Sequence, residues 1–91
     1  MTIVARQVTV HGHVQGVFFR DACRREADQH GVTGWVRNNP DGTVEAFFEG
    51  PVDSVAALVK WAHVGPKWAV VERVVVTDAE PAGLPDFRVR G

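Results

Sequence analysis

Cysteine and long apolar runs are scarce in this sequence of 91 residues, in which Cys23 is the only cysteine. A single cysteine excludes an internal disulfide and suits a reducing compartment. No apolar run approaches the roughly 20 residues that a transmembrane helix needs, and the N-terminus lacks a charged segment followed by a long apolar stretch. We therefore expect a cytoplasmic protein that makes no use of a membrane, with a monomer as the default state.

A surplus of charge of either sign is also missing, since 10 Lys and Arg residues are balanced by 11 Asp and Glu residues. The formal net charge of −1 offers no broad basic field to nucleic acid or anionic lipid, so any selectivity for an anion must be local. The carboxylates are scattered, and none are paired at a spacing typical of acid–base catalysis or metal binding. With 45% hydrophobic residues, the chain is typical of one globular domain over residues 1–91.

Hydrophobic periodicity predicts an α+β fold. Alternating runs predict strands over residues 6–11, 32–38, 43–49, 69–77 and 87–89. Apolar residues at helical spacing predict a helix over 20–30, capped by Gly31, and a second helix that starts at Pro51 and stops at Gly65-Pro66. The order βαββαβ, with a short extra C-terminal strand, predicts a ferredoxin-like sandwich in which two helices cover one face of an antiparallel sheet.

One glycine-containing stretch, residues 12–20, joins the first predicted strand to the first predicted helix; it reads Gly-His-Val-Gln-Gly-Val-Phe-Phe-Arg. Its glycines, Gly12 and Gly16, allow a sharp turn in which main-chain N–H groups converge on an anion at the positive end of the helix dipole. Arg20 lies in the first helical turn, where a cation opposes the dipole unless an anion offsets it. Because a guanidinium makes two parallel bonds to a phosphoryl group, the stretch predicts a phosphate site.

Asn38 ends the second predicted strand, far from this stretch along the chain. A right-handed crossover makes the first two strands run in the same direction, so that their C-terminal ends share one edge of the sheet. We therefore expect Asn38 to lie beside residues 12–20 and to complete the site.

Two segments of the chain resemble the signatures of the acylphosphatase family. Residues 12–20 resemble the first, and Gly34-Trp35-Val36-Arg37-Asn38, followed by Gly42-Thr43-Val44 and Gly50, resembles the second. The resemblance continues through Gly65-Pro66, Ala69, Val71 and Val74. It implies hydrolysis of a small acyl phosphate to a carboxylate and inorganic phosphate, without a metal or other cofactor.

The same resemblance implies the roles of particular residues. The phosphate-binding arginine of the family falls on Arg20, and the asparagine that orients the attacking water falls on Asn38. The main-chain cradle for the phosphoryl group falls on five loop residues, His13, Val14, Gln15, Gly16 and Val17. A carboxylate is a good leaving group, so we expect positioning and charge stabilisation to supply most of the catalysis.

The remaining chemically active residues have structural interpretations. Gln15 is expected to brace the loop, and Cys23 to pack in the core. His11 and His13 read as surface residues, because no third metal ligand accompanies them. The three tryptophans are expected to pack against other residues; they are Trp35, Trp61 and Trp68. The sequence offers no account of the Lys67-Trp68 pair. The carboxylate of Gly91 is a conceivable partner for Arg20.

Three alternatives follow from the same residues. A regulatory domain that binds a phosphorylated metabolite without hydrolysing it would also use the loop and Arg20. An RNA-binding module is disfavoured, because the open sheet face would present a single aromatic side chain between carboxylates; its residues would be Gln7, Thr9, His11, Thr43, Glu45, Phe47 and Glu49. Acylphosphatase-like domains also occur inside larger carbamoyl-transfer proteins, but the end of the chain near residue 91 favours a free-standing form.

Overall fold

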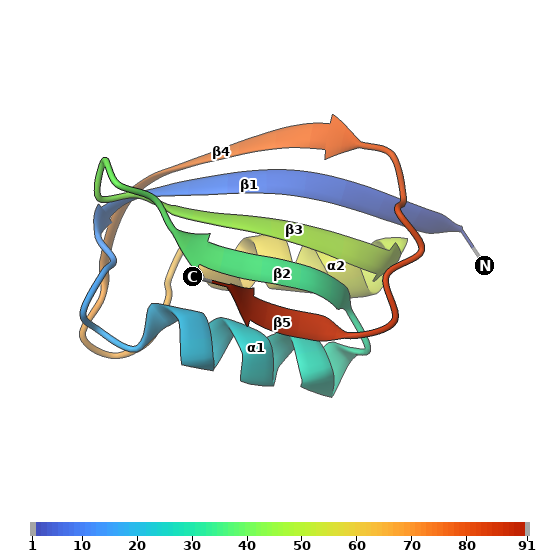
Figure 1. Cartoon of the computed structure of the whole chain (residues 1–91), viewed down its shortest axis with the longest axis horizontal. Coiled ribbons are helices and arrows are strands. Elements are labelled where there is room, and N and C mark those ends of the chain that lie inside the picture. The colour runs from blue at the N-terminus through green and yellow to red at the C-terminus, as the bar shows by residue number, and fades with distance from the viewer. Residues whose placement is uncertain (1, 91) are drawn as a thin grey trace.

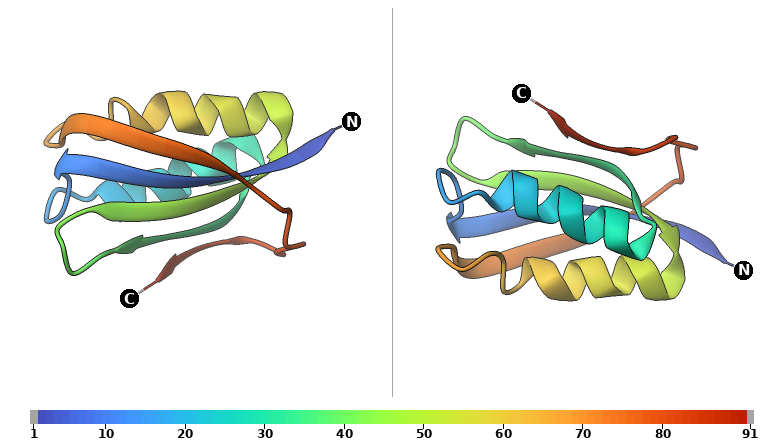
Figure 2. Two further views of the ribbon diagram at one scale, coloured as in Figure 1. Left: turned by 90° about the horizontal axis from the view of Figure 1, so that it is seen from above. Right: turned by 90° about the horizontal axis from the view of Figure 1, so that it is seen from below.

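The computed structural model describes residues 2–90 and forms a single five-stranded sheet with two helices on one face. Figure 1 shows the strands in the order β4-β1-β3-β2-β5. Figure 2 shows both helices behind the sheet in one view and in front of it in the other. The elements are β1 Ile3–His13, α1 Phe19–His30, β2 Thr33–Asn38, β3 Val44–Pro51, α2 Val52–Ala62, β4 Val70–Ala79 and β5 Phe87–Arg90. Neither helix is long and apolar enough to cross a membrane.

The predicted βαββαβ order and ferredoxin-like sandwich are confirmed. Neighbouring strands are antiparallel except at one edge, where the short strand β5 pairs in parallel with β2. The sheet is therefore mixed, because the chain crosses from β4 at one edge to β5 at the other (Figure 1).

Strand register brings the ends of β1 and β2 together. Val44, at the start of the central strand β3, pairs with Val10 of β1 on one side and with Asn38 of β2 on the other. Strands β1 and β2, which flank β3, run in the same direction, so the loop after β1 leaves the sheet beside Asn38. The proximity that the sequence predicted thus arises from two antiparallel pairings with one shared strand.

Helix α1 buries the apolar stripe that its spacing predicts. Its buried residues are Phe19, Ala22, Cys23 and Ala27. Cys23 is fully buried, and this burial raises the pKa of its thiol well above the ordinary value, as expected of a core residue. Gly31 takes the left-handed conformation of a C-cap, with φ of 68°.

Helix α2 begins one residue later than the sequence predicts, and it stops before Gly65-Pro66 as expected. It begins at Val52, with Pro51 as the preceding N-cap residue, and ends at Ala62 before the Gly65-Pro66 pair. Pro51 stays extended, with ψ of 143°, because it also pairs with Ile3 at the end of the β1–β3 ladder. The proline therefore finishes a strand and does not occupy the first helical position.

The open face of the sheet is better covered than the sequence suggests. Phe47 is buried because Trp35 stacks on it, with ring centroids 6.3 Å apart. Glu49 is also buried, and its carboxylate accepts hydrogen bonds from the backbone N–H groups of Ala82 (2.6 Å) and Gly83 (3.0 and 3.2 Å). These bonds hold the crossing segment between β4 and β5 against the sheet, next to the start of β5.

Loss of the Glu49 carboxylate should destabilise the fold. We expect Glu49→Gln to lower the free energy of unfolding by about 2 kcal/mol, because the charge-assisted bonds from the N–H groups of Ala82 and Gly83 to the buried carboxylate are weakened. Urea denaturation measures the change, and Glu72→Gln, at an exposed position on β4, is the matched control. Equal stability of the two variants would show that Glu49 does not anchor the crossing segment.

Candidate active site

The loop between β1 and α1 has a backbone shaped for an anion. Gly16 and Phe18 both have left-handed conformations, with φ of 74° and 63°, and Val17 between them does not. Such alternation turns successive main-chain N–H groups toward one concave surface, which is the geometry of an anion-binding nest. Phe18 is the only non-glycine residue with positive φ within residues 2–90. Its conformation costs about 1–2 kcal/mol, so the surrounding structure must impose it.

Gly12 is required where the loop leaves the sheet. A Cβ at this position would lie 2.1 Å from the carbonyl oxygen of Val70 in β4. The backbone of β1 can approach β4 this closely only without a side chain. A register shift between His11 and Gly12 marks the same point in the β1–β4 ladder.

Helix α1 begins without a side-chain cap. The N–H of Ala22 donates to the carbonyl of Phe18 (3.1 Å), and the N–H groups before it are left for other acceptors. Arg20 follows in the first turn and is half-buried. Within residues 2–90 its guanidinium forms no ion pair and no side-chain hydrogen bond. A helix N-terminus with free N–H groups and an unpaired arginine is suited to an anionic ligand.

A pocket of about 290 Å³ collects these groups. Its lining residues are Val14, Gly16, Phe18, Phe19, Arg20, Asp21 and Asn38. Asn38 reaches it from the end of β2, so the structure brings together the two residues for which the sequence predicts catalytic roles. The Oδ1 atom of Asn38 is buried and has no hydrogen-bond partner within the described part of the chain. Because an unpaired buried acceptor is costly, it indicates a ligand or water as its partner.

The five loop residues expected to form the cradle occupy different environments. Val14 and Gly16 line the pocket, whereas His13, Gln15 and Val17 do not. His13 still belongs to β1, where it pairs with Val70, and Val17 is buried in the hydrophobic core.

Gln15 braces the loop, as predicted. Its Nε2 donates to the backbone carbonyls of Asn39 (2.7 Å) and Thr43 (3.0 Å), which ties the loop to the turn between β2 and β3. That turn is held in its own right, because Asp41 Oδ1 accepts hydrogen bonds from the hydroxyl (2.6 Å) and the N–H (3.0 Å) of Thr43. The Thr43 hydroxyl, followed by its N–H, holds the pKa of Asp41 below its ordinary value.

Sequence reasoning missed three residues of the pocket, Phe18, Phe19 and Asp21. Phe19 belongs to the buried face of α1, where its ring packs on Trp61 with centroids 5.1 Å apart. Phe18 and Asp21 were assigned no role. Their adjacency to Arg20 in the first helical turn was the available signal, but sequence alone does not show which side chains turn toward a pocket.

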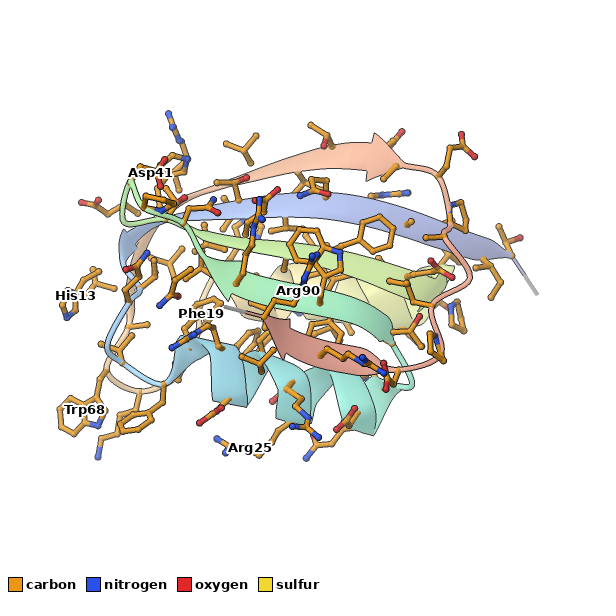
Figure 3. The ribbon with its side chains drawn as sticks, in the orientation of Figure 1. His13, Phe19, Arg25, Asp41, Trp68 and Arg90 are labelled. Carbon is orange, nitrogen blue, oxygen red and sulfur yellow. The ribbon has the colours of Figure 1, made fainter. Side chains whose placement is uncertain are left out.

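The predictions for the tryptophans, Lys67 and Gly91 have different outcomes. Packing roles are confirmed for Trp35 and Trp61. The one for Trp68 is wrong, because this residue is 66% exposed in the loop before β4. Lys67 lies over the Trp68 indole, with Nζ 5.0 Å from the ring centroid, so the two neighbouring residues form a cation–π contact. Figure 3 shows Trp68 projecting from the end of the molecule where His13 and Asp41 also lie. The suggested contact between Gly91 and Arg20 lies outside the described residues.

Fold and pocket together define a class of protein. A ferredoxin-like sandwich that places an uncapped helix N-terminus, a left-handed loop and an arginine without a partner among residues 2–90 in one pocket is a small α+β protein suited to a tetrahedral anion.

Comparison with known proteins identifies the family. The family model described as acylphosphatase matches residues 6–89. An acylphosphatase from Nocardioides sp. is 57% identical over 86 residues, which cover 94% of this chain and 87% of that protein. One from Thermococcus kodakarensis is 53% identical over 91 residues and 100% of both chains. The structure of an acylphosphatase from Coxiella burnetii has a TM-score of 0.93 and 41% identity, covering 97% of this chain and 93% of that one. The chain therefore belongs to the acylphosphatase family.

Membership of this family establishes the activity. The protein is an enzyme that hydrolyses the carboxyl-phosphate bond of acyl phosphates, so its substrate is a small acyl phosphate and its products are a carboxylate and inorganic phosphate. The regulatory-domain alternative receives no support from these relatives.

The hydrogen bonds from Thr43 to Asp41 predict a lowered pKa for the Asp41 carboxyl group. Hydrogen bonds to the carboxylate favour its charged form, so Asp41 should titrate below its ordinary pKa of 3.8. A depressed folded pKa stabilises the fold above the unfolded value and loses that contribution as the pH falls through the folded value. We expect NMR titration of the carboxyl group to show this low midpoint, and Thr43→Val to raise it. An unchanged midpoint in Thr43→Val would assign the shift to another group.

Proposed function

We propose that Arg20 and main-chain N–H groups of the loop in which Val14 and Gly16 line the pocket bind the phosphoryl group, and that Asn38 orients the water that attacks phosphorus. The observation that carries this assignment is the convergence of two unpaired groups on one pocket. The guanidinium of Arg20 has no protein partner within residues 2–90, and the Oδ1 of Asn38 is a buried acceptor without one.

Binding of the phosphoryl group is an electrostatic task. The transferring group carries its charge on three oxygens, and the protein offers a guanidinium, the loop N–H groups and the positive end of α1. These donors are held in place before the substrate arrives, since Gln15 ties the loop to the β2–β3 turn. Preorganised donors stabilise the charge of the transition state without reorganisation during the reaction.

Hydrolysis itself needs little acid or base catalysis. Water attacks phosphorus, the bond from phosphorus to the acyl oxygen breaks, and the electron pair leaves with the carboxylate. The amide of Asn38 can accept a hydrogen bond from this water, but a neutral amide does not take up its proton. The proton passes to the phosphate oxygens of the substrate, which yields inorganic phosphate. On this mechanism no metal ion is required. A cytoplasmic location and a monomeric state remain predictions from the sequence.

Removal of the Arg20 guanidinium should nearly abolish activity. With excess chelator present, we expect wild type to hydrolyse acetyl phosphate and Arg20→Ala to lose at least roughly a hundredfold in kcat/KM, because a bidentate charge-assisted contact contributes about 2–3 kcal/mol. Arg25→Ala is the matched control, since this exposed arginine of α1 points away from the sheet in Figure 3. Turnover that stops on chelation would contradict the metal-free mechanism, and equal loss in both variants would contradict the role of Arg20.

Substitution of Asn38 should lower turnover without weakening phosphate binding. We expect Asn38→Ala to lose turnover by roughly a hundredfold or more while inorganic phosphate binds with nearly wild-type affinity, because the amide acts on the water. Asn38→Asp should also be impaired, since its carboxylate cannot donate and repels the phosphoryl group. Phosphate affinity by calorimetry and single-turnover rates distinguish the two effects. A normal rate in Asn38→Asp would show that an amide is not needed.

A further inference from the structure

Phe18 is the most unusual residue of the pocket. Phe18 precedes Phe19 and Arg20 among the residues that line the pocket, yet it is 71% exposed. Its backbone is also left-handed, a conformation that glycine or asparagine adopts at much lower cost. A phenylalanine here gains little from burial within the protein and strains the backbone. Such strain concentrates at ligand sites, where a bound group accounts for it.

The proposed mechanism leaves one part of the substrate without a partner. Arg20 and the N–H groups take the phosphoryl oxygens, and the attacking and leaving oxygens stand roughly in line through phosphorus. Asn38 approaches from β2, and the rest of the pocket wall comes from the loop and the start of α1. The leaving acyl group lies opposite the attacking water, and Phe18 is the most exposed apolar residue that lines the pocket.

We propose that Phe18 is a specificity residue whose exposed ring forms the surface on which the acyl group lies, so that the enzyme prefers acyl phosphates with an apolar, uncharged acyl group. This inference rests on the proposed function. Contact with the acyl group removes part of the ring from water and gives an aromatic acyl group a stacking partner.

Asp21, which lines the same pocket as Phe18, adds a preference based on the charge of the acyl group. Asp21 lines the pocket and is exposed, and its carboxylate forms no ion pair within residues 2–90. At neutral pH it repels an acyl group that carries a carboxylate of its own, whereas the phosphoryl charge is compensated by Arg20. Phe18 thus attracts apolar acyl groups, and Asp21 disfavours anionic ones.

The first experiment compares kcat/KM for benzoyl phosphate and acetyl phosphate. We expect Phe18→Asn, which suits the left-handed backbone but has no ring, to lower the preference for benzoyl phosphate by about tenfold. Phe18→Tyr keeps the ring and should keep the preference. Trp68→Ala is the matched control, because this equally exposed aromatic residue does not line the pocket.

The outcomes separate this inference from the assignment of the catalytic residues. A preference unchanged in Phe18→Asn, or lowered equally in Trp68→Ala, would overturn the role of Phe18 while leaving Arg20 and Asn38 in theirs. Full activity in Arg20→Ala would instead overturn the proposed function.

The second experiment tests this preference based on charge with substrates of matched chain length. Wild type should favour butyryl phosphate over succinyl phosphate, which carries an additional carboxylate. Asp21→Asn should reduce this ratio by roughly threefold at low ionic strength, with a smaller effect at high salt because the repulsion is screened. A ratio that is the same in wild type and Asp21→Asn at low salt would overturn the role of Asp21.

Discussion

The bare N-terminus of α1 is the constraint on which the site depends. A helix that begins without a side-chain cap leaves main-chain N–H groups unsatisfied, and Arg20 adds a cation where the dipole already disfavours one. Neither feature stabilises the free protein. An anion in the pocket would offset both, which is the binding role that we propose for the first turn of α1.

The rest of the molecule holds this arrangement in place. Apolar residues of α1 pack into the core, which fixes where the helix begins, and Gly12 lets the chain leave β1 in close contact with β4. Gln15 then ties the loop to the turn after β2, where Thr43 and Asp41 form their own hydrogen bonds. Because the same β3 residue, Val44, pairs with Val10 and with Asn38, the start of the loop and the amide lie at the same end of the sheet.

Local patterns predicted most of the fold, and errors arose where one residue serves two elements. The stripe of α1 and the cap at Gly31 depend on neighbours within a few positions, and both were correct. Pro51 suits the first turn of a helix, but its pairing with Ile3 keeps it in β3. Trp68 was assigned to packing because tryptophan is mostly apolar, although its loop leaves the ring exposed.

By itself, the sequence determined the order of elements, the glycine loop before Arg20 and the family to which the chain belongs. These properties rest on residue type and short spacing, which a linear pattern records. Only the tertiary structure decided that Asn38 presents a buried, unpaired oxygen, that Glu49 binds the crossing segment, and that Phe18 takes a left-handed conformation at the pocket. Each of these depends on contacts or backbone angles imposed by segments distant in the chain, and no local pattern encodes them.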